Sequence, residues 1–324
     1  MIKSIRNILM AVSLVLILAG CCSIVQGPWC NKTPSLNGHK ASFLLDNGGT
    51  RVMNILSPNL AYNNFQDIVK RCINIGDDTI YLYLMNEKDG PWTPYSMYVN
   101  NQIGGALNES VVKEYEKRIE YIRSKDLGIV FFLRADDSPN FNKVMVRGKG
   151  LFKGKMVEKI VYTAPPEVIP PIDESFLTNG IVLSFNKRST ASQEQYQKDA
   201  VRLFDNDTMA WIVGLEANEY YSDGTINHYA NHMQGLTSKH IGVHLTPMKY
   251  SAALQSSIDG LWLQYGFNKS PSQIAADTKS IISKMGGKPV HATEYNLSSD
   301  SATAKAQGDQ AYASGAKSTG NGRN

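Results

Sequence analysis

The sequence lacks the residue patterns that mark several common classes of enzyme. No Gly-x-Gly-x-x-Gly or P-loop pattern follows a predicted strand, which argues against an open nucleotide-binding sheet. No Gly-x-Ser-x-Gly follows a strand, so a Ser/His/Asp hydrolase would have no nucleophile elbow. The 4 cysteines and 6 histidines do not show the spacing of a zinc site. We therefore expect neither a metal nor an organic cofactor.

The sequence also lacks a strong excess of charge of either sign. Its 324 residues include 33 Lys and Arg against 29 Asp and Glu. Removing residues 1–20 takes away two basic residues, which leaves 31 basic against 29 acidic residues and a charge of about +2. Net charge therefore does not indicate nucleic acid as a partner. The remaining length suits one large α/β barrel or two small domains.

The apolar run near the N-terminus is too short to span a bilayer comfortably. It extends from Ile8 to Leu18, about ten residues, and follows the basic residues Lys3 and Arg6. The run ends in Leu18-Ala19-Gly20-Cys21, which resembles the lipobox of bacterial lipoproteins. The resemblance implies a signal peptide over residues 1–20 and a lipid on Cys21, with a plain secretory signal as the alternative. Lipidation would anchor the chain to a membrane of the bacterial cell envelope, facing the periplasm or exterior.

After a predicted tether over residues 21–45, short β-like runs alternate with helical patterns as far as residue 324. Eight strands alternating with helices predict an α/β fold, a (β/α)8 TIM barrel rather than an open doubly wound sheet. The predicted strands are Arg51–Leu56, Thr79–Met85, Gly128–Arg134, Trp211–Leu215, Ile241–Leu245, Gly260–Tyr265, Pro289–Thr293 and Ala316–Gly320. The predicted helices span residues 60–75, 109–125, 191–205, 224–238, 249–258, 271–285 and 301–314.

Residues 138–190, after the third predicted strand, are too many for an ordinary loop. Two β-like runs within them, 144–146 and 157–162, could pair as a hairpin. We therefore predict a β-rich insertion beside the barrel mouth. It either contacts the ligand or is a solvated surface excursion.

The carboxyl ends of barrel strands meet on one face, so residues far apart in sequence come together there. Two glutamates at those ends could act as general acid and nucleophile on a glycosidic bond. Aromatic side chains at the same face would stack on sugar rings. The candidate catalytic residues are Glu216, Glu219 and Glu294, and the candidate substrate-binding residues are Asn218, Tyr265, Tyr295, His244, Arg134 and Trp92.

Asn218-Glu219 after the fourth strand and Thr293-Glu294-Tyr295 after the seventh resemble the motifs of clan A glycoside hydrolases. These are retaining (β/α)8 enzymes. The resemblance covers about residues 50–322, and the overall likeness is to uncharacterised, glycosidase-like bacterial lipoproteins. It implies that Glu219 is the acid/base and Glu294 the nucleophile. It further implies that Asn218 contacts the sugar 2-hydroxyl and that Tyr265 supports Glu294 through a hydrogen bond.

Two questions stay open at the level of sequence. Glu216 competes with Glu219, because strand alternation gives the two opposite faces unless the strand has ended by Ala217. Tyr220 stands where many family members have proline, and residues 320–323 contain no tryptophan as a sugar platform.

From the two glutamate motifs and the lipobox-like sequence, the chain is expected to be a membrane-anchored retaining glycosidase acting on a carbohydrate. The alternative is a catalytically inactive barrel that binds carbohydrate or protein.

Overall fold

The computed structural model divides the chain into Met1–Ser35 and Leu36–Asn324, and every described residue lies in the second unit. The structure describes residues 38–42, 56, 60–84, 97–99, 103–134, 143–148, 157–163, 181–182, 189–266, 269–295 and 301–320. Cys21 and Trp92 lie outside these ranges, and so does the predicted strand 51–56 apart from Leu56.

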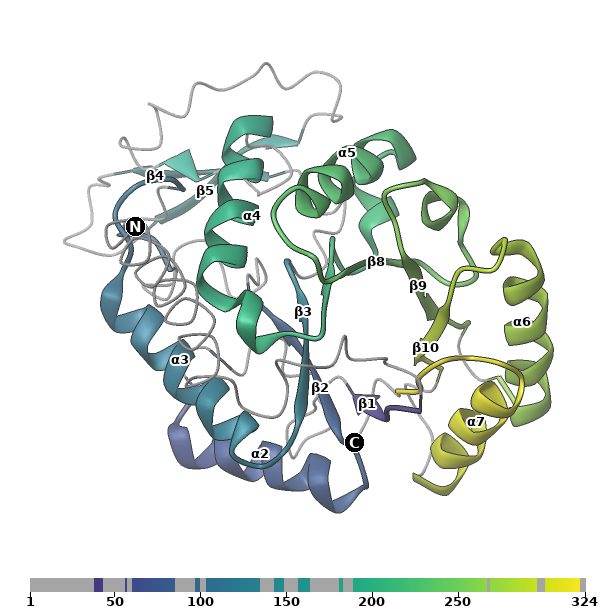
Figure 1. Cartoon of the computed structure of the whole chain (residues 1–324). Coiled ribbons are helices and arrows are strands. Elements are labelled where there is room, and N and C mark those ends of the chain that lie inside the picture. Colours follow the sequence, from purple (N-terminus) through teal and green to yellow (C-terminus); the bar gives the residue numbers. More distant parts are fainter. Residues whose placement is uncertain are drawn as a thin grey trace, which may run out of the picture. The chain divides into compact units, whose positions relative to one another are not determined.

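A seven-stranded, entirely parallel sheet forms the centre of the fold, in the order β1-β2-β3-β7-β8-β9-β10. The strands are β1 (Ala41–Ser42), β2 (Thr79–Tyr83), β3 (Gly128–Phe132), β7 (Ala210–Ile212), β8 (His240–Leu245), β9 (Gly260–Gln264) and β10 (Val290–Glu294). The helices are α2 (Tyr62–Asn74), α3 (Glu109–Arg123), α4 (Thr190–Phe204), α5 (Asp223–Gln234), α6 (Pro271–Lys284) and α7 (Ser301–Ala313). Figure 1 shows the helices around the outside of the curled sheet. This is the alternating α/β arrangement that the sequence predicts.

The strand beside β2 is a correction to the sequence prediction. It is β1, whose two residues lie in the segment predicted to be a tether, and its partners in β2 are Thr79 and Ile80. Two residues are too few to show a period-2 pattern, so sequence reading has no signal to detect. The predicted helix 249–258 is also wrong, because only the short 3₁₀ helix η9 (Ser251–Leu254) forms there. Gln255 already has an extended backbone with ψ 144°, which ends the helix.

The sheet separates two layers of buried side chains. The outer layer joins the strands to the surrounding helices. The inner layer is built without any helical residue, so it fills the concave side of the sheet; its members are Tyr81, Tyr83, Val130, Phe132, Met209, Ala210, Ile212, Leu215 and Trp262. Because both faces are buried, β2, β3 and β9 read as nearly continuous apolar runs.

Residues 316–320, predicted to be the eighth strand, make backbone contacts with both ends of the sheet. Thr319 forms parallel bridges with Ala292 of β10 and with Lys40, which directly precedes β1. The amide of Thr319 donates to the carbonyl of His39 at 3.0 Å, and the amide of Ala292 donates to that of Ser318 at 2.9 Å. The two edge strands are thus connected through one short segment.

The helices α4, α5 and α6 begin at serine residues whose side chains cap them. Ser189 and Ser222 each accept a hydrogen bond from the backbone of the third residue after them, at the starts of α4 and α5. Ser270 and Gln273 form a full capping box at the start of α6, where Pro271 occupies the first turn. Among the described residues, no helix is both long and apolar enough to cross a membrane.

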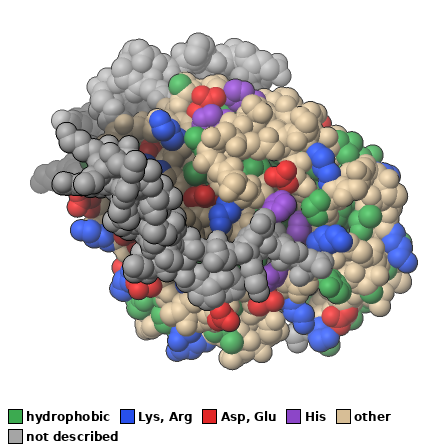
Figure 2. Space-filling model, in the orientation of Figure 1, with side chains coloured by type: hydrophobic (Ala, Val, Ile, Leu, Met, Phe, Trp, Pro, Cys, Tyr) green, Lys and Arg blue, Asp and Glu red, His purple; other side chains and the backbone are tan. Residues whose placement is uncertain are grey.

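A second sheet has three strands in the order β5-β4-β6. β4 (Lys143–Gly148) pairs antiparallel with β5 (Val157–Thr163), and β6 (Ile181–Val182) pairs antiparallel with the other edge of β4. On the face of the molecule drawn in Figure 2, basic and acidic side chains are interspersed over the described surface.

Gly242 on β8 tests the packing of the inner layer. A Cβ atom at this position would lie 2.1 Å from Cζ3 of Trp262 and 2.8 Å from Cδ1 of Ile212. We expect Gly242→Ala to lower the free energy of unfolding by about 1–3 kcal/mol, because an overpacked core strains its neighbours. Urea unfolding measures this change. Gly224→Ala is the control: its nearest atom would be Ser222 Oγ at 3.8 Å, so stability should be unchanged or slightly higher.

His291 on β10 predicts a dependence of stability on pH. Its ring stacks on Trp262 with centroids 4.1 Å apart, and its Nδ1 lies 2.8 Å from Ser318 Oγ. Burial, with His240 and Lys317 as positive neighbours, lowers the pKa of His291 from 6.5 to about 3. Between those values the unfolded chain binds a proton that the folded chain does not. Stability is therefore lost as the pH falls below about 6.5, by up to ~1.4 kcal/mol per pH unit.

Urea unfolding at several pH values between 7 and 4.5, for wild type and His291→Gln, measures that loss. The variant should show a shallower slope by up to one proton. Equal slopes for the two proteins would contradict a buried, neutral His291.

Candidate active site

Glu294 ends β10 and is nearly fully buried, with 2% of its surface exposed. The register between β9 and β10 shifts between Ala292 and Glu294, so Glu294 pairs with Gln264. A bulge of this kind redirects the side chains that follow it. Here it turns the carboxylate toward the concave side of the sheet, where His244 lies. A carboxylate is rarely buried without a partner, so its surroundings indicate its role.

His244 lies between Glu294 and the loop that follows β7. Its Nδ1 accepts a hydrogen bond from the backbone amide of Glu216 at 3.1 Å, which leaves the ring proton on Nε2. That Nε2 is 4.0 Å from Oε2 of Glu294, which is close enough for an electrostatic interaction but too far for a hydrogen bond. The ring is fully buried and packs edge to face against Phe132, with ring centroids 5.9 Å apart. One imidazole therefore connects the two segments that carry the predicted catalytic glutamates.

The backbone after β7 leaves the strand before it reaches these glutamates. β7 ends at Ile212, and Ala217–Glu219 form the 3₁₀ helix η8, closed by the Glu219 amide donating to the Glu216 carbonyl at 2.9 Å. Strand alternation therefore does not decide between Glu216 and Glu219. Glu216 has a left-handed backbone with φ 47°, which is uncommon for a residue other than glycine. Both side chains are partly exposed.

Asn218 is bonded to the end of the neighbouring β-α loop. Its Oδ1 accepts from the backbone amide of Thr246 at 2.8 Å, and its Nδ2 donates to Thr246 Oγ1 at 2.7 Å. This reciprocal pair fixes η8 against the residue that follows β8. One lone pair of Oδ1 and one N–H of Asn218 are thus engaged with protein, which leaves its second N–H and the other lone pair of Oδ1 for the sugar contact that the family resemblance implies.

Arg134 follows β3 and holds the residues just after Glu219. The guanidinium carbon lies 3.8 Å from the ring centroid of Tyr220 and 4.6 Å from that of Tyr221. Nη1 donates to the hydroxyl of Tyr221 at 2.9 Å, and the Tyr220 hydroxyl donates to the carbonyl of Leu215 at 2.7 Å. Only 1% of the Arg134 surface is exposed, and its contacts with Tyr220 and Tyr221 hold this loop in place. The substrate contact expected of Arg134 stays a prediction.

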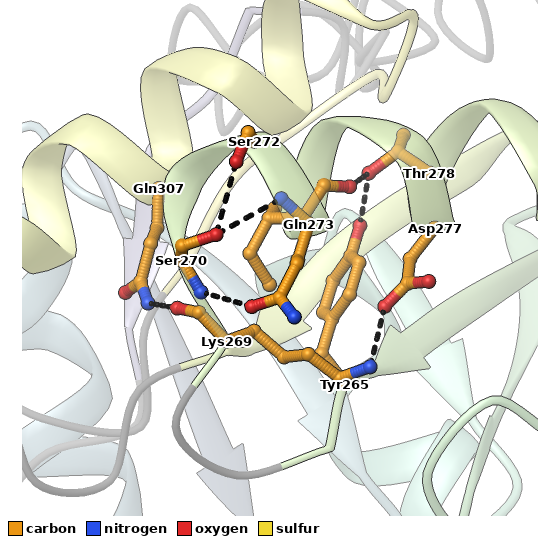
Figure 3. A network of polar contacts seen from close by, with 9 residues as sticks. Tyr265, Lys269, Ser270, Ser272, Gln273, Asp277, Thr278 and Gln307 are labelled. Atoms are coloured by element: carbon orange, nitrogen blue, oxygen red, sulfur yellow. Dashed lines mark hydrogen bonds and ion pairs between the residues drawn. The ribbon is translucent and has the colours of Figure 1, made fainter.

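Tyr265 and Tyr295 do not face the predicted site. Tyr265 donates its hydroxyl to Thr278 of α6 at 2.7 Å, because Thr278 itself donates to the carbonyl of Ile274 (Figure 3). The two tyrosine rings meet edge to face in the layer between strands and helices, 6.1 Å apart. Burial raises the pKa of both hydroxyls, which therefore stay neutral. The hydroxyl of Tyr265 is thus bonded to Thr278 rather than to Glu294, and Tyr295 packs beside it in the outer layer.

The hydrogen bonds around Tyr265 belong to a network that fixes the start of α6. Lys269 pairs with Asp277 at 3.2 Å, and Gln307 of α7 donates to the carbonyl of Lys269. Figure 3 shows these contacts beside the Tyr265 hydroxyl. Tyr265 therefore anchors α6 to the end of β9.

Gln264 is a buried polar residue paired with Glu294 that the sequence analysis does not include among the candidates. It precedes Tyr265, shares a strand face with Trp262 of the inner layer, and is 4% exposed. The available signal is period-2 alternation along β9, which assigns Gln264 to the inner face and Tyr265 to the outer one.

A small cavity lies beside Arg134 and Tyr221, between β3, β7, α4 and α5. Gln193, Gln197 and Tyr221 in its lining are hydrogen-bonded to protein groups. The cavity is smaller than the volume that ligand pockets usually have. Among the described residues, no group of three His, Cys, Asp or Glu side chains could hold a metal ion.

The comparisons with known proteins concern the fold. No protein-family model matches the sequence, and no curated protein is significantly similar to it. The structure resembles an endo-1,4-β-mannanase from Rhizomucor miehei, with a TM-score of 0.55 and 13% identity, over 92% of this chain and 89% of the other. It also resembles an endo-β-1,4-mannanase from Thermotoga petrophila, with a TM-score of 0.51 and 13% identity, over 90% of this chain and 68% of the other.

An exo-β-1,4-mannosidase from Opitutaceae bacterium strain TAV5 is more distant, with a TM-score of 0.49 and 11% identity. The match covers 86% of this chain but only 53% of that protein. The chain is therefore similar in fold to the barrel glycoside hydrolases of clan A, as its motifs indicate.

Tyr265→Phe distinguishes the observed role of Tyr265 from the implied one. Removing the hydroxyl should lower the free energy of unfolding by about 1 kcal/mol, the usual value of one hydrogen bond. A double-mutant cycle with Thr278→Val, followed by urea unfolding, should show that the two losses are coupled. Additive losses would contradict the hydrogen bond between Tyr265 and Thr278.

Proposed function

We propose that this chain is a retaining glycoside hydrolase with Glu294 as nucleophile and Glu219 as acid/base. The observation that carries the proposal is the position of His244, whose ring joins the backbone of Glu216 to the carboxylate of Glu294. Two glutamate-bearing segments, 75 residues apart between positions 219 and 294, thus converge on one buried side chain. Convergence of strand ends is how this fold assembles its active sites.

A retaining mechanism uses two carboxyl groups about 5–5.5 Å apart, and the proposal assigns these roles to Glu294 and Glu219. Glu294 attacks the anomeric carbon while Glu219 gives its proton to the departing oxygen, so the glycosidic bond breaks as the glycosyl ester forms. Glu219, now ionised, takes a proton from water, and that water releases the sugar from Glu294. Two close carboxylates do not both ionise easily, which keeps one protonated near neutral pH.

The proposal includes a closed eight-stranded barrel with the three-stranded sheet as an insertion after β3. Closure is supported by Thr319, which bridges to Ala292 on one side and to Lys40 on the other. The insertion is supported by β4 and β5, which pair between β3 and α4 in the chain. When β1 is counted as the first strand and residues 316–320 as the eighth, β7 and β10 take the fourth and seventh positions. Clan A glycosidases carry their two glutamates at these positions.

We further propose a β-1,4-linked mannan or a related β-linked glycan as the substrate class. The support is the likeness in fold to two endo-β-1,4-mannanases. The lipobox-like sequence at Cys21 supports a lipid-anchored protein of the bacterial cell envelope. Residues 22–37 would then link the lipid to Gly38, where the described part of the fold begins.

A second candidate function is an inactive barrel that binds carbohydrate or protein. Two observations favour it: the side chain of Asn218 is tied to Thr246, and the hydroxyl of Tyr265 is tied to Thr278. Both positions resemble ones that clan A enzymes use at the reacting sugar. Turnover, rather than binding, therefore separates the two functions.

Glu294→Gln and Glu219→Gln test the catalytic proposal on purified protein with 4-nitrophenyl β-D-mannoside and β-D-glucoside. Glu294→Gln should lose at least ~10³-fold in kcat/KM, because the covalent step is removed. Glu219→Gln should lose ~10²-fold or more in kcat, because the water that releases the sugar lacks its base, while its kcat/KM falls less because 4-nitrophenolate leaves without a proton. Both variants should keep the circular dichroism spectrum of the wild type. External azide should restore turnover in Glu294→Ala, since it can occupy the space left by the carboxylate.

Glu216→Gln is the matched control, because Glu216 lies in the same loop and its hydrogen bond to His244 comes from the backbone amide, which glutamine keeps. Its kcat/KM should stay within about tenfold of wild type, since the general acid and nucleophile remain. Full activity in Glu294→Gln would reject the assignment. Sugar binding without turnover in the wild type would favour the inactive module.

A further inference from the structure

The side-chain oxygen of Gln264 is buried, yet it has no hydrogen-bond partner among the residues that the structure describes. Only 4% of the residue surface is exposed. A buried carbonyl group without a partner destabilises the folded protein, so most such groups in native proteins are paired. An exception beside a candidate active site indicates a group that a ligand would satisfy.

Gln264 faces the same space as Glu294. Leu261, Leu263 and Tyr265 belong to the outer layer, whereas Trp262 belongs to the inner one, so alternation assigns Gln264 to the inner face. The register pairs Gln264 directly with Glu294 on the adjacent strand. Neighbouring strands are ~4.8 Å apart, which brings the two side chains to the same level of the barrel interior.

The backbone around Gln264 is held on both sides. Its carbonyl accepts from the amide of Met248 at 3.0 Å, and Met248 has a left-handed backbone with φ 60°. The amide of the next residue, Tyr265, donates to the carbonyl of Glu294 at 2.7 Å. The strand end is therefore fixed, and the Gln264 amide group cannot find a partner through a small shift of its own backbone.

We propose that Gln264 is a substrate-binding residue whose side-chain oxygen accepts a hydrogen bond from a ring hydroxyl of the sugar at Glu294. This inference rests on the proposed glycosidase function and deepens it. An uncharged amide binds a hydroxyl donor without changing its own protonation, so the contact holds across the pH range of turnover. The site then selects a polyhydroxylated ring over an apolar group of the same size.

Gln264→Met tests the proposal, because methionine keeps the length of the side chain and removes the amide. We expect its melting temperature to be equal to or above that of wild type, since an unsatisfied polar group is replaced by an apolar one. We expect at least a tenfold loss in kcat/KM on 4-nitrophenyl β-D-mannoside or β-D-glucoside. The shift in melting temperature caused by the corresponding methyl glycoside should also shrink.

Gln197→Met on α4 is the matched control. Gln197 is also 4% exposed, but its Nε2 donates to the carbonyl of Tyr229 and its Oε1 pairs with His232. This variant should have a lower melting temperature and an unchanged kcat/KM. The opposite effects on stability separate a ligand-binding glutamine from a structural one.

A lower melting temperature for Gln264→Met, or a kcat/KM equal to that of wild type, overturns the inference while leaving the catalytic glutamates untouched. If the wild type hydrolyses neither glycoside, the hydrolase proposal fails, and the shift with methyl glycosides decides the role of Gln264. A shift in wild type that is lost in Gln264→Met supports sugar binding. No shift in wild type rejects it.

Discussion

The buried imidazole of His244 is the contact on which the account of this site depends. It accepts the amide of Glu216 on one side and directs its Nε2–H toward Glu294 on the other. Because Nδ1 already accepts the hydrogen bond from the Glu216 amide, a proton on Nδ1 would break that hydrogen bond. The neutral ring thus couples the position of the loop after β7 to the end of β10. A catalytic pair needs such coupling, since small errors in position reduce rates strongly.

The two faces of the sheet carry different kinds of contact. On the inner face, Trp262 stacks on His291, and Gln264 and Glu294 follow these two residues along the same strands. The polar groups therefore lie next to a stacked pair of rings. On the outer face, Tyr265 bonds to Thr278 and anchors α6. The loop that carries Glu219 is secured independently, by the pair of Asn218 with Thr246 and by the stack of Arg134 on Tyr220. These contacts preorganise the mouth in the absence of a ligand, which suits either a hydrolase or a binding module.

Sequence reasoning recovers the parts of this fold that have a strong periodic signal. The strands at β2, β3 and β7 to β10 are confirmed because runs buried on both faces stand out between amphipathic helices. β1 escapes detection because it has two residues. The predicted helix 249–258 is wrong because the backbone becomes extended at Gln255, after one turn. Glu294 is correctly located at a strand end. Tyr295 lies in the outer layer because a bulge between Ala292 and Glu294 changes the alternation along β10 in a way that composition does not reveal. Tyr265 lies there because β9 alternates regularly, a signal that the family resemblance outweighed.

The most direct test of the central claim is a covalent trap of the wild-type protein with an activated 2-deoxy-2-fluoro β-glycoside, followed by mass spectrometry of its peptides. Such a reagent forms the glycosyl ester quickly and releases it slowly, so the label marks the nucleophile. The account predicts a single glycosyl label on the peptide that contains Glu294, and none on the peptide that contains Glu216 and Glu219. A label in the loop after β7, or turnover of the parent glycoside without any label, would contradict it.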